Sequence, residues 1–152
     1  MDMLKRLERL HGKIRLVLDT DTYNEIDDQF AVSYALASPD EIDLLALYAA
    51  PFFNQNSTSP EDGMNRSYDE IIKLLRLAGR EDMIRNVFRG SKNYLPDEKT
   101  PVESEACDNI INTVMTSEEP VTIVAVGAIT NVASAIVKCP DIVKKTGVVW
   151  LG

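Results

Sequence analysis

The sequence is poor in the nitrogen and sulfur side chains that bind zinc or copper. Of its 152 residues, one is histidine (His11) and two are cysteine (Cys107 and Cys139). Neither cysteine lies in a CxxC or Cys/His pattern, so a zinc site is not expected, and two cysteines are too few for a disulfide scaffold. We expect two buried thiols in a reducing compartment, the cytoplasm, and chemistry that depends on carboxylates, amides and hydroxyls.

Basic residues and long hydrophobic runs are also scarce. The chain has 16 Lys and Arg against 24 Asp and Glu, which gives a net charge of -8 at pH 7. This charge argues against a nucleic-acid backbone or an anionic membrane as a partner. No apolar stretch approaches the length of a membrane span. Residues 1–12 form a charged, polar leader that does not resemble a secretory signal, and we expect His11 within it to be solvated.

The remaining sequence has an ordinary globular composition, with 45% hydrophobic and 26% charged residues. Five short apolar runs are expected to form strands: residues 13–20, 42–50, 86–90, 121–126 and 147–151. Four segments with helical signals lie between them: residues 28–38, 60–78, 101–114 and 131–138. This alternation predicts an α/β fold, a mostly parallel sheet with helices on both faces. We expect residues 1–152 to form a single domain.

Local signals indicate how these helices begin and which face is apolar. Ser59 and Asp62 predict a helix start closed by a capping box, and Gly79 suits the end of the same helix. Residues 100–103 repeat this start signal. In the first helix, four residues at helical spacing predict one apolar face: Phe30, Ala31, Tyr34 and Ala35.

The most informative segment contains four aspartates within ten residues. Asp19 and Asp21 end the first strand run, and Asp27 and Asp28 stand where the first helix begins. Carboxylates this crowded repel one another unless a cation shares them. Oxygen ligands without histidine or thiolate favour Ca²⁺ or Mg²⁺. A cation of this kind can acidify a bound water, and a neighbouring aspartate can take its proton.

The predicted sheet brings other polar residues to the same place. In open parallel sheets, ligands bind at the carboxyl ends of the strands. That edge is expected to carry the aspartates, Asn54 and Asn56 after the second strand, and the turn 127–131 after the fourth. We therefore expect one polar site there, built from segments far apart in the sequence.

These segments resemble a known family, the inosine-uridine-preferring nucleoside hydrolases. The family's first signature is matched by five residues of this chain: Asp19, Asp21, Asp27, Asp28 and Ala31. Residues 126–133 (VGAITNVA) resemble its second landmark, and residues 148–152 resemble the strand that follows. The resemblance implies a Rossmann-like nucleoside hydrolase fold.

The resemblance also implies a metal site. Asp28 would be the main carboxylate ligand of a Ca²⁺ ion, with Mg²⁺ as the alternative. The backbone carbonyl of Thr130 would be a further ligand. Asp21 would contact the ion and take a proton from the attacking water. Asp19 would support the loop.

The implied substrate is a ribonucleoside. Asp27 would bind ribose hydroxyls, and Asn54 is the likeliest match to the ribose-contacting asparagine of the family, with Asn56 as the alternative. The implied reaction is hydrolysis of the N-glycosidic bond to ribose and free base, through an oxocarbenium-like transition state. Such a reaction belongs to purine or pyrimidine salvage.

The chain departs from the family pattern in its first loop and in its length. Five residues separate Asp21 from Asp27, where the family usually has three, and residues 50–57 differ from the usual Ala-Gly-Asn. Family members are also roughly twice as long. We expect the N-terminal half of a longer nucleoside hydrolase domain, which lacks a C-terminal half or forms a homo-oligomer. On its own the chain is expected to show little or no activity.

Two other functions remain open at this point. Residues 16–22 also resemble the opening motif of haloacid-dehalogenase-type phosphatases, in which Asp19 would be the nucleophile, Asp21 the acid/base and Mg²⁺ the metal. No convincing downstream lysine or acidic-pair motif accompanies it. Alternatively, the chain is a non-catalytic half-domain that binds a cation or a nucleoside, or that pairs through an exposed sheet edge.

Overall fold

A single parallel sheet forms the centre of the molecule in the computed structural model, which describes residues 12–151. Five strands lie in the order β3-β2-β1-β4-β5. They are β1 (Ile14–Thr20), β2 (Ile42–Ala49), β3 (Val87–Arg89), β4 (Val121–Ala125) and β5 (Thr146–Trp150). All neighbouring pairs are parallel, which confirms the predicted sheet. The predictions for His11 and nearly all of the polar leader lie outside the described residues.

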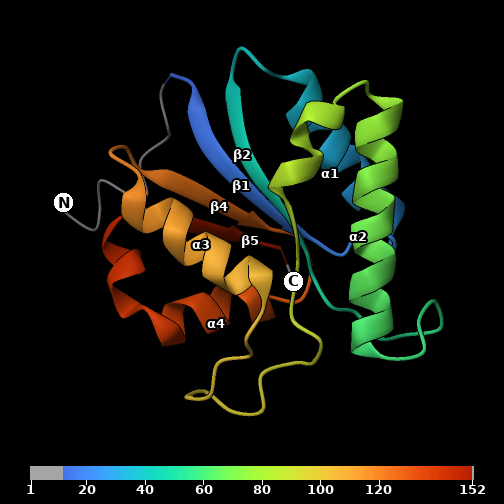
Figure 1. Ribbon diagram of the computed structural model, residues 1–152, viewed down its shortest axis with the longest axis vertical. Coiled ribbons are helices and arrows are strands. Elements are labelled where there is room, and N and C mark those ends of the chain that lie inside the picture. Colours follow the sequence, from blue (N-terminus) through green and yellow to red (C-terminus); the bar gives the residue numbers. More distant parts are fainter. Residues whose placement is uncertain (1–11, 152) are drawn as a thin grey trace.

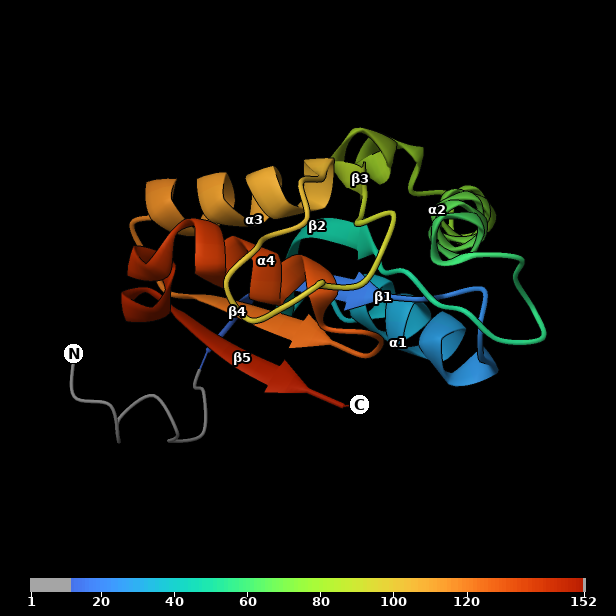
Figure 2. The ribbon, with the colours of Figure 1, turned by 90° about the horizontal axis from the view of Figure 1, so that it is seen from below.

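Helices cover both faces of this sheet, as predicted (Figures 1 and 2). They are α1 (Ile26–Ala37), α2 (Pro60–Leu77), α3 (Glu105–Thr116) and α4 (Thr130–Lys138). Helices α1 and α2 pack on one face, and α3 and α4 pack on the other. Short 3-10 helices, η2 (Glu81–Asn86) and η3 (Pro140–Lys144), precede β3 and β5. No helix among residues 12–151 is long and apolar enough to cross a membrane.

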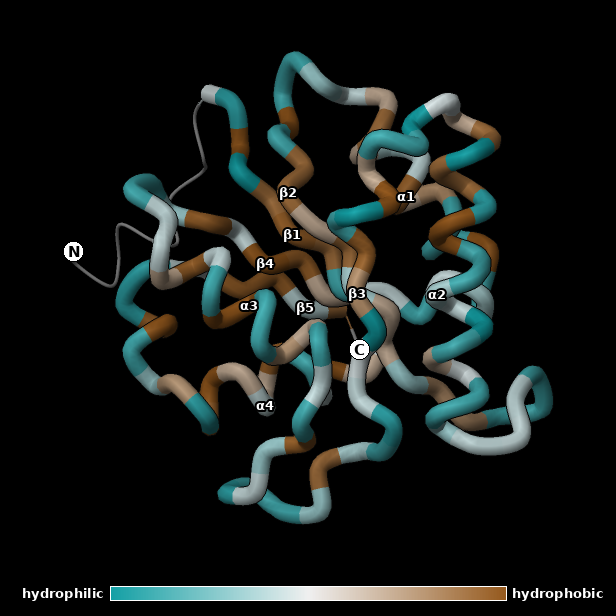
Figure 3. The backbone as a smooth tube through the Cα atoms, in the orientation of Figure 1, coloured by the Kyte–Doolittle hydropathy of each residue, from teal (hydrophilic) through white to brown (hydrophobic). Residues whose placement is uncertain are grey.

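The sheet has a hydrophobic core on each side because successive strand side chains point to opposite faces. On one side, Leu16 and Leu18 of β1 pack in a cluster with Leu75 of α2. On the other side, Val17 packs in a cluster with Ile110 of α3. Burial on both faces explains the near-continuous apolar runs of the central strands, which Figure 3 shows as brown segments in the middle of the molecule.

The topology places the loops after β1 and β4 side by side. The chain leaves β1 toward β2 and β3, and then returns to β4 on the opposite side of β1. Backbone hydrogen bonds continue past the strand ends, since Val126 N donates to Asp19 O at 2.9 Å. The carboxyl ends of β1 and β4 therefore form the topological switch point, where open α/β sheets bind ligands.

The apolar face predicted for α1 is buried in the core only at Ala35. Phe30 and Tyr34 are 68% and 64% exposed. The helix instead buries Asp28, Val32 and Ala35, which are spaced for one face. Apolar residues occur on both sides of α1, so their spacing alone could not show which side packs on the sheet. The exposed residues Ile26, Phe30 and Tyr34 are here termed the α1 apolar row.

The last strand is also open on one side. Strand β5 pairs only with β4 among the described strands. Val149, Trp150 and Leu151 are each more than half exposed. These three residues and the α1 apolar row together are termed the open apolar surface.

Helix ends agree with the sequence in part. Ser59 Oγ accepts Asp62 N at 3.0 Å, which confirms the predicted cap, but the Asp62 carboxylate accepts Thr58 N at 2.9 Å and so does not return to Ser59. The start predicted at residues 100–103 is wrong. Helix α3 begins at Glu105, capped by Ser104, because residues 97–100 form a separate polar turn around Asp97.

Candidate active site

The aspartates of the first loop surround a cavity at the switch point. This acidic cavity has a volume of about 430 Å³. Its lining includes Asp21, Asn24, Asp27, Asp28, Gly127 and Leu151. The loop after β1 thus meets the turn after β4 at the carboxyl edge, as the sequence predicts.

A larger cavity of about 600 Å³ lies elsewhere, between α3 and the sheet, and is lined by Arg15, Asn109 and Asn112 among others. It contains none of the predicted site residues. We regard the acidic cavity as the site, because parallel sheets bind ligands at the carboxyl ends of their strands.

Two carboxylates in the acidic cavity carry unfavourable negative charge. Burial raises the pKa of Asp28 to about 7; the Thr20 hydroxyl, which donates to Asp28 Oδ1 at 2.6 Å, opposes this rise, and the negative charges of Asp21 and Asp27 add to it. Burial also raises the pKa of Asp21, against the effect of hydrogen bonds from its own backbone and from Asn24. A bound cation would relieve the cost of both ionised groups.

Gly127 allows the β4 turn to approach Asp21 closely. A Cβ atom at position 127 would lie 2.5 Å from Asp21 Oδ1, far inside van der Waals contact. The indole Nε1 of Trp150 donates to Gly127 O at 2.9 Å and ties this turn to the end of β5. The second sequence landmark therefore needs a glycine at position 127, because a larger residue would clash with Asp21 of the first.

Asp19 lies outside the cavity, in a buried group centred on Asn131. Asn131 Nδ2 donates to Asp19 Oδ1 at 2.8 Å and to Ala49 O at 3.3 Å. Asn131 Oδ1 accepts Ser91 N at 2.7 Å and Ser91 Oγ at 2.9 Å. We term these four residues the Asn131 junction. It joins the carboxyl ends of β1, β2 and β3 to the start of α4.

The junction leaves one carboxylate oxygen without a partner. Among the described residues, Asp19 Oδ2 is the buried side-chain oxygen or nitrogen that has no hydrogen bond. Burial raises the pKa of Asp19 to about 7, the Asn131 bond opposes this rise, and the charge of Asp21 adds to it. Asp19 is fully buried. Its carboxylate is therefore buried in the junction and does not line the acidic cavity.

A further polar chain connects the cavity to the loop after β2. Asn24 Nδ2 donates to Asp21 Oδ2 at 3.0 Å, and Asn24 Oδ1 accepts Asn54 Nδ2 at 2.6 Å. Asn56 Nδ2 donates to Asn24 O at 3.3 Å. Sequence reasoning singled out Asn54 and Asn56 but missed Asn24, for which the one available signal was the unusual length of the loop that carries it.

Comparison with known proteins decides the family. Residues 16–152 match the family described as inosine-uridine preferring nucleoside hydrolase. The chain belongs to this family. No curated protein sequence matches the chain significantly.

Solved structures agree with this family. The purine-preferring ribonucleoside hydrolase from Gardnerella vaginalis is 25% identical, with a TM-score of 0.68 over 91% of this chain and 48% of its own. An inosine-guanosine nucleoside hydrolase (IG-NH) is 22% identical, with a TM-score of 0.66 over 91% and 49%. The type III effector XopQ, solved with adenosine diphosphate ribose, shares the fold at 15% identity, with a TM-score of 0.71 over 97% and 46%. The chain spans about half the length of each of these structures.

The predicted metal ligands are brought together only in part. Asp21 and Asp28 both line the acidic cavity, whereas Thr130 is buried in the first turn of α4, outside the cavity lining. Within residues 12–151 no group of three or more His, Cys, Asp or Glu side chains could hold a metal ion. The donors present fit a hard cation in kind, because all of them are oxygens, but they are fewer than a Ca²⁺ ion requires.

The phosphatase alternative is not favoured. It requires Asp19 as a nucleophile, but Asp19 is 0% exposed and bonded to Asn131. The family match covers both landmarks, which the phosphatase motif leaves unexplained. A nucleoside hydrolase resemblance therefore accounts for more of the chain.

Proposed function

We propose that this protein is a Ca²⁺-dependent nucleoside hydrolase, which hydrolyses the N-glycosidic bond of ribonucleosides to ribose and free base. One observation carries the proposal: Asp21, Asp27 and Asp28 of the first family signature line a single cavity with residues 126–128 of the second. Family membership and the shared fold support it. Nucleoside salvage in the cytoplasm is the setting that this reaction and the sequence suggest.

Each proposed role follows from position. Asp21 is the proposed base, because its buried carboxylate lines the cavity beside Asp28, where the cation and the attacking water would lie. Asp27 is exposed at the cavity, where its oxygens can accept hydrogen bonds from ribose hydroxyls. Asn54 contributes to ribose binding through the hydrogen bond that its side chain donates to Asn24.

The cation proposal rests on the donor set. Asp28 and Asp21 would hold Ca²⁺, or Mg²⁺, with the Thr130 carbonyl as a further ligand. The cation would supply a positive charge that lowers the pKa of the attacking water. Because Ca²⁺ takes about six to eight oxygen ligands, the proposal requires donors beyond these residues.

The partner proposal rests on the open apolar surface. Family structures extend over about twice the length of this chain. Phe30, Tyr34 and Trp150 are large apolar side chains, and each is more than half exposed. Exposed apolar patches of this kind often mark interaction sites. We propose that the complementary half of the family fold, or a second copy of the chain, covers this surface and brings further ligands to the acidic cavity.

A calcium titration tests the proposal at its centre. We expect Ca²⁺ to bind the purified chain and to bind Asp28→Asn at least 10-fold more weakly, since one carboxylate ligand is lost. Asp69→Asn removes an exposed carboxylate from α2 and serves as the matched control, with unchanged affinity. Equal binding by all three proteins would remove the cation site, and so would the absence of binding when the complementary half is present. Release of ribose, and not phosphate, from inosine or uridine by the chain with its complementary half would establish the reaction.

A further inference from the structure

The lengthened loop after β1 brings an amide into a cavity whose other polar side chains are acidic. Asn24 lines the acidic cavity beside Asp21, Glu25, Asp27 and Asp28. Carboxylates accept hydrogen bonds when ionised, and only the amide can donate. Of the described residues in the lining, Asn24 is therefore the one with a side-chain N–H group.

The neighbours of Asn24 determine which way its amide faces. Asp21 Oδ2 accepts, so the nitrogen of Asn24 lies toward it at 3.0 Å. Asn54 Nδ2 donates, so the oxygen of Asn24 lies toward it at 2.6 Å. The Asn24 backbone is held as well, because its N donates to Asp21 O at 2.7 Å and its O accepts from Asn56 at 3.3 Å. The amide is thus fixed in place before any ligand arrives.

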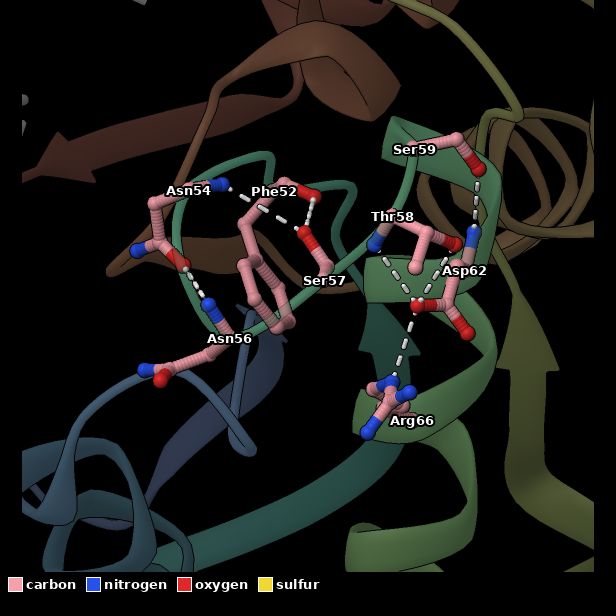
Figure 4. A network of polar contacts seen from close by, with 8 residues as sticks. All are labelled: Phe52, Asn54, Asn56, Ser57, Thr58, Ser59, Asp62 and Arg66. Carbon is pink, nitrogen blue, oxygen red and sulfur yellow. Dashed lines mark hydrogen bonds and ion pairs between the residues drawn. The ribbon is translucent and has the colours of Figure 1, made fainter.

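Both polar side-chain atoms of Asn54 form hydrogen bonds within the protein. Its Nδ2 donates to Asn24. Its Oδ1 accepts Asn56 N at 2.9 Å, as Figure 4 shows. The same loop is pinned by Ser57, whose Oγ donates to Phe52 O at 3.0 Å. Asn54 also lies outside the cavity lining. Its geometry is that of a brace behind Asn24.

We infer that Asn24 is a specificity-determining residue of the sugar site, and that Asn54 acts through it. An amide nitrogen carries two hydrogens, and Asp21 accepts one of them. The other donates to a ring hydroxyl of the bound ribose, while Asp27 accepts from the diol. A hydroxyl both donates and accepts, so a wall of carboxylates alone would leave its acceptor unpaired. This inference rests on the proposed function and names the residue that reads the sugar.

The test uses anhydro-D-ribitol, a ribofuranose ring without a base, and its two analogues that each lack one ring hydroxyl. Binding is measured by calorimetry with Ca²⁺ present. We expect Asn24→Ala to weaken binding of the parent ring by about 3- to 10-fold, the usual range for one neutral hydrogen bond. The variant should also lose discrimination against one of the two analogues. Asn112→Ala, on exposed α3 surface, is the matched control and should behave as the parent protein.

A second measurement needs no folded variant. In the parent protein, the side-chain amide resonances of Asn24 should shift on titration with the ring. If Asn24→Ala binds all three rings as the parent protein does, while Asp27→Asn does not bind, the inference is wrong and the proposed function stands. If the ring shifts the amide resonances of Asn54 and leaves those of Asn24 unmoved, the inference is also wrong. If the parent protein binds none of the rings even when it is assembled with its complementary half, the proposed function fails together with the inference.

Discussion

The Asn131 junction and the acidic cavity lie side by side at the carboxyl edge but are built in opposite ways. In the junction, one amide pairs with three other residues, all buried, and only Asp19 Oδ2 lacks a partner. In the cavity, Asp21 and Asp28 are crowded carboxylates without a cationic partner among the described contacts. Aspartates from one short motif therefore lie in two different environments: Asp19 is buried in the junction, and Asp21 and Asp28 line the acidic cavity.

The largest expected effect is a loss of stability when the Asn131 junction is disrupted. Asn131→Ala removes four hydrogen bonds at once and leaves Asp19 buried without a donor. We expect the free energy of unfolding to fall by about 3 kcal/mol or more, as measured by urea denaturation. Asn112→Ala is again the control. A loss below about 1 kcal/mol would mean that the junction is not a structural centre.

The second effect is a dependence of stability on pH. The folded pKa values of Asp19 and Asp28 are raised to about 7 from 3.8. The folded state therefore binds more protons than the unfolded state between these values, and stability falls as pH rises through that window. We expect the melting temperature to drop by several degrees from about pH 5 to about pH 8. Asp19→Asn should flatten the profile, and a profile that rises over this range would contradict the expectation.

A smaller effect of opposite sign is expected in the cavity. At about pH 8, Asp28→Asn removes a charge that the folded state disfavours, while its side-chain oxygen can still accept from Thr20. The free energy of unfolding should rise by about 1 kcal/mol without Ca²⁺, and stabilisation by added Ca²⁺ should be lost. Thermal unfolding with and without Ca²⁺ measures both. A destabilised variant would place Asp28 with the junction, and the contrast between the two regions would disappear.

The smallest effect on stability is expected at the exposed rim. Asp27 makes no described side-chain hydrogen bond, so Asp27→Asn should change the free energy of unfolding by no more than about 0.5 kcal/mol. Binding of the ribofuranose ring should nevertheless weaken strongly, because one acceptor for the diol becomes an amide. Calorimetry and denaturation on the same sample compare the two. Unchanged ring binding would remove Asp27 from the sugar site.

The order of strands and helices could be predicted from the sequence because it depends on short-range periodicity. Strands buried on both faces are continuous apolar runs, and Ser59 marks its helix clearly. Two helix details failed for physical reasons. Residues 100–103 have the sequence pattern of a helix cap, but Thr100 forms a turn instead, in which its backbone N and its hydroxyl donate to the Asp97 carboxylate. Phe30 and Tyr34 have helical spacing, but α1 turns them outward.

The site could be predicted where it depends on strand ends and not where it depends on loops. The meeting of Asp21 with Gly127 follows from parallel topology. The roles of Asn24 and Asn131 depend on side-chain distances across segments far apart in sequence, which no local pattern encodes. Asn131 lies within the second landmark, but its bonds to Asp19 and Ser91 became visible only in three dimensions.

The single tryptophan gives the molecule an optical reporter of its own. Trp150 is about half exposed, and its indole N–H is bonded to the carbonyl of Gly127, a residue of the cavity lining. Indole emission is sensitive to both hydration and local charge. A ligand that enters the cavity and a partner that covers the exposed ring should therefore change the fluorescence spectrum in different ways. One unlabelled sample can thus follow occupancy and assembly together.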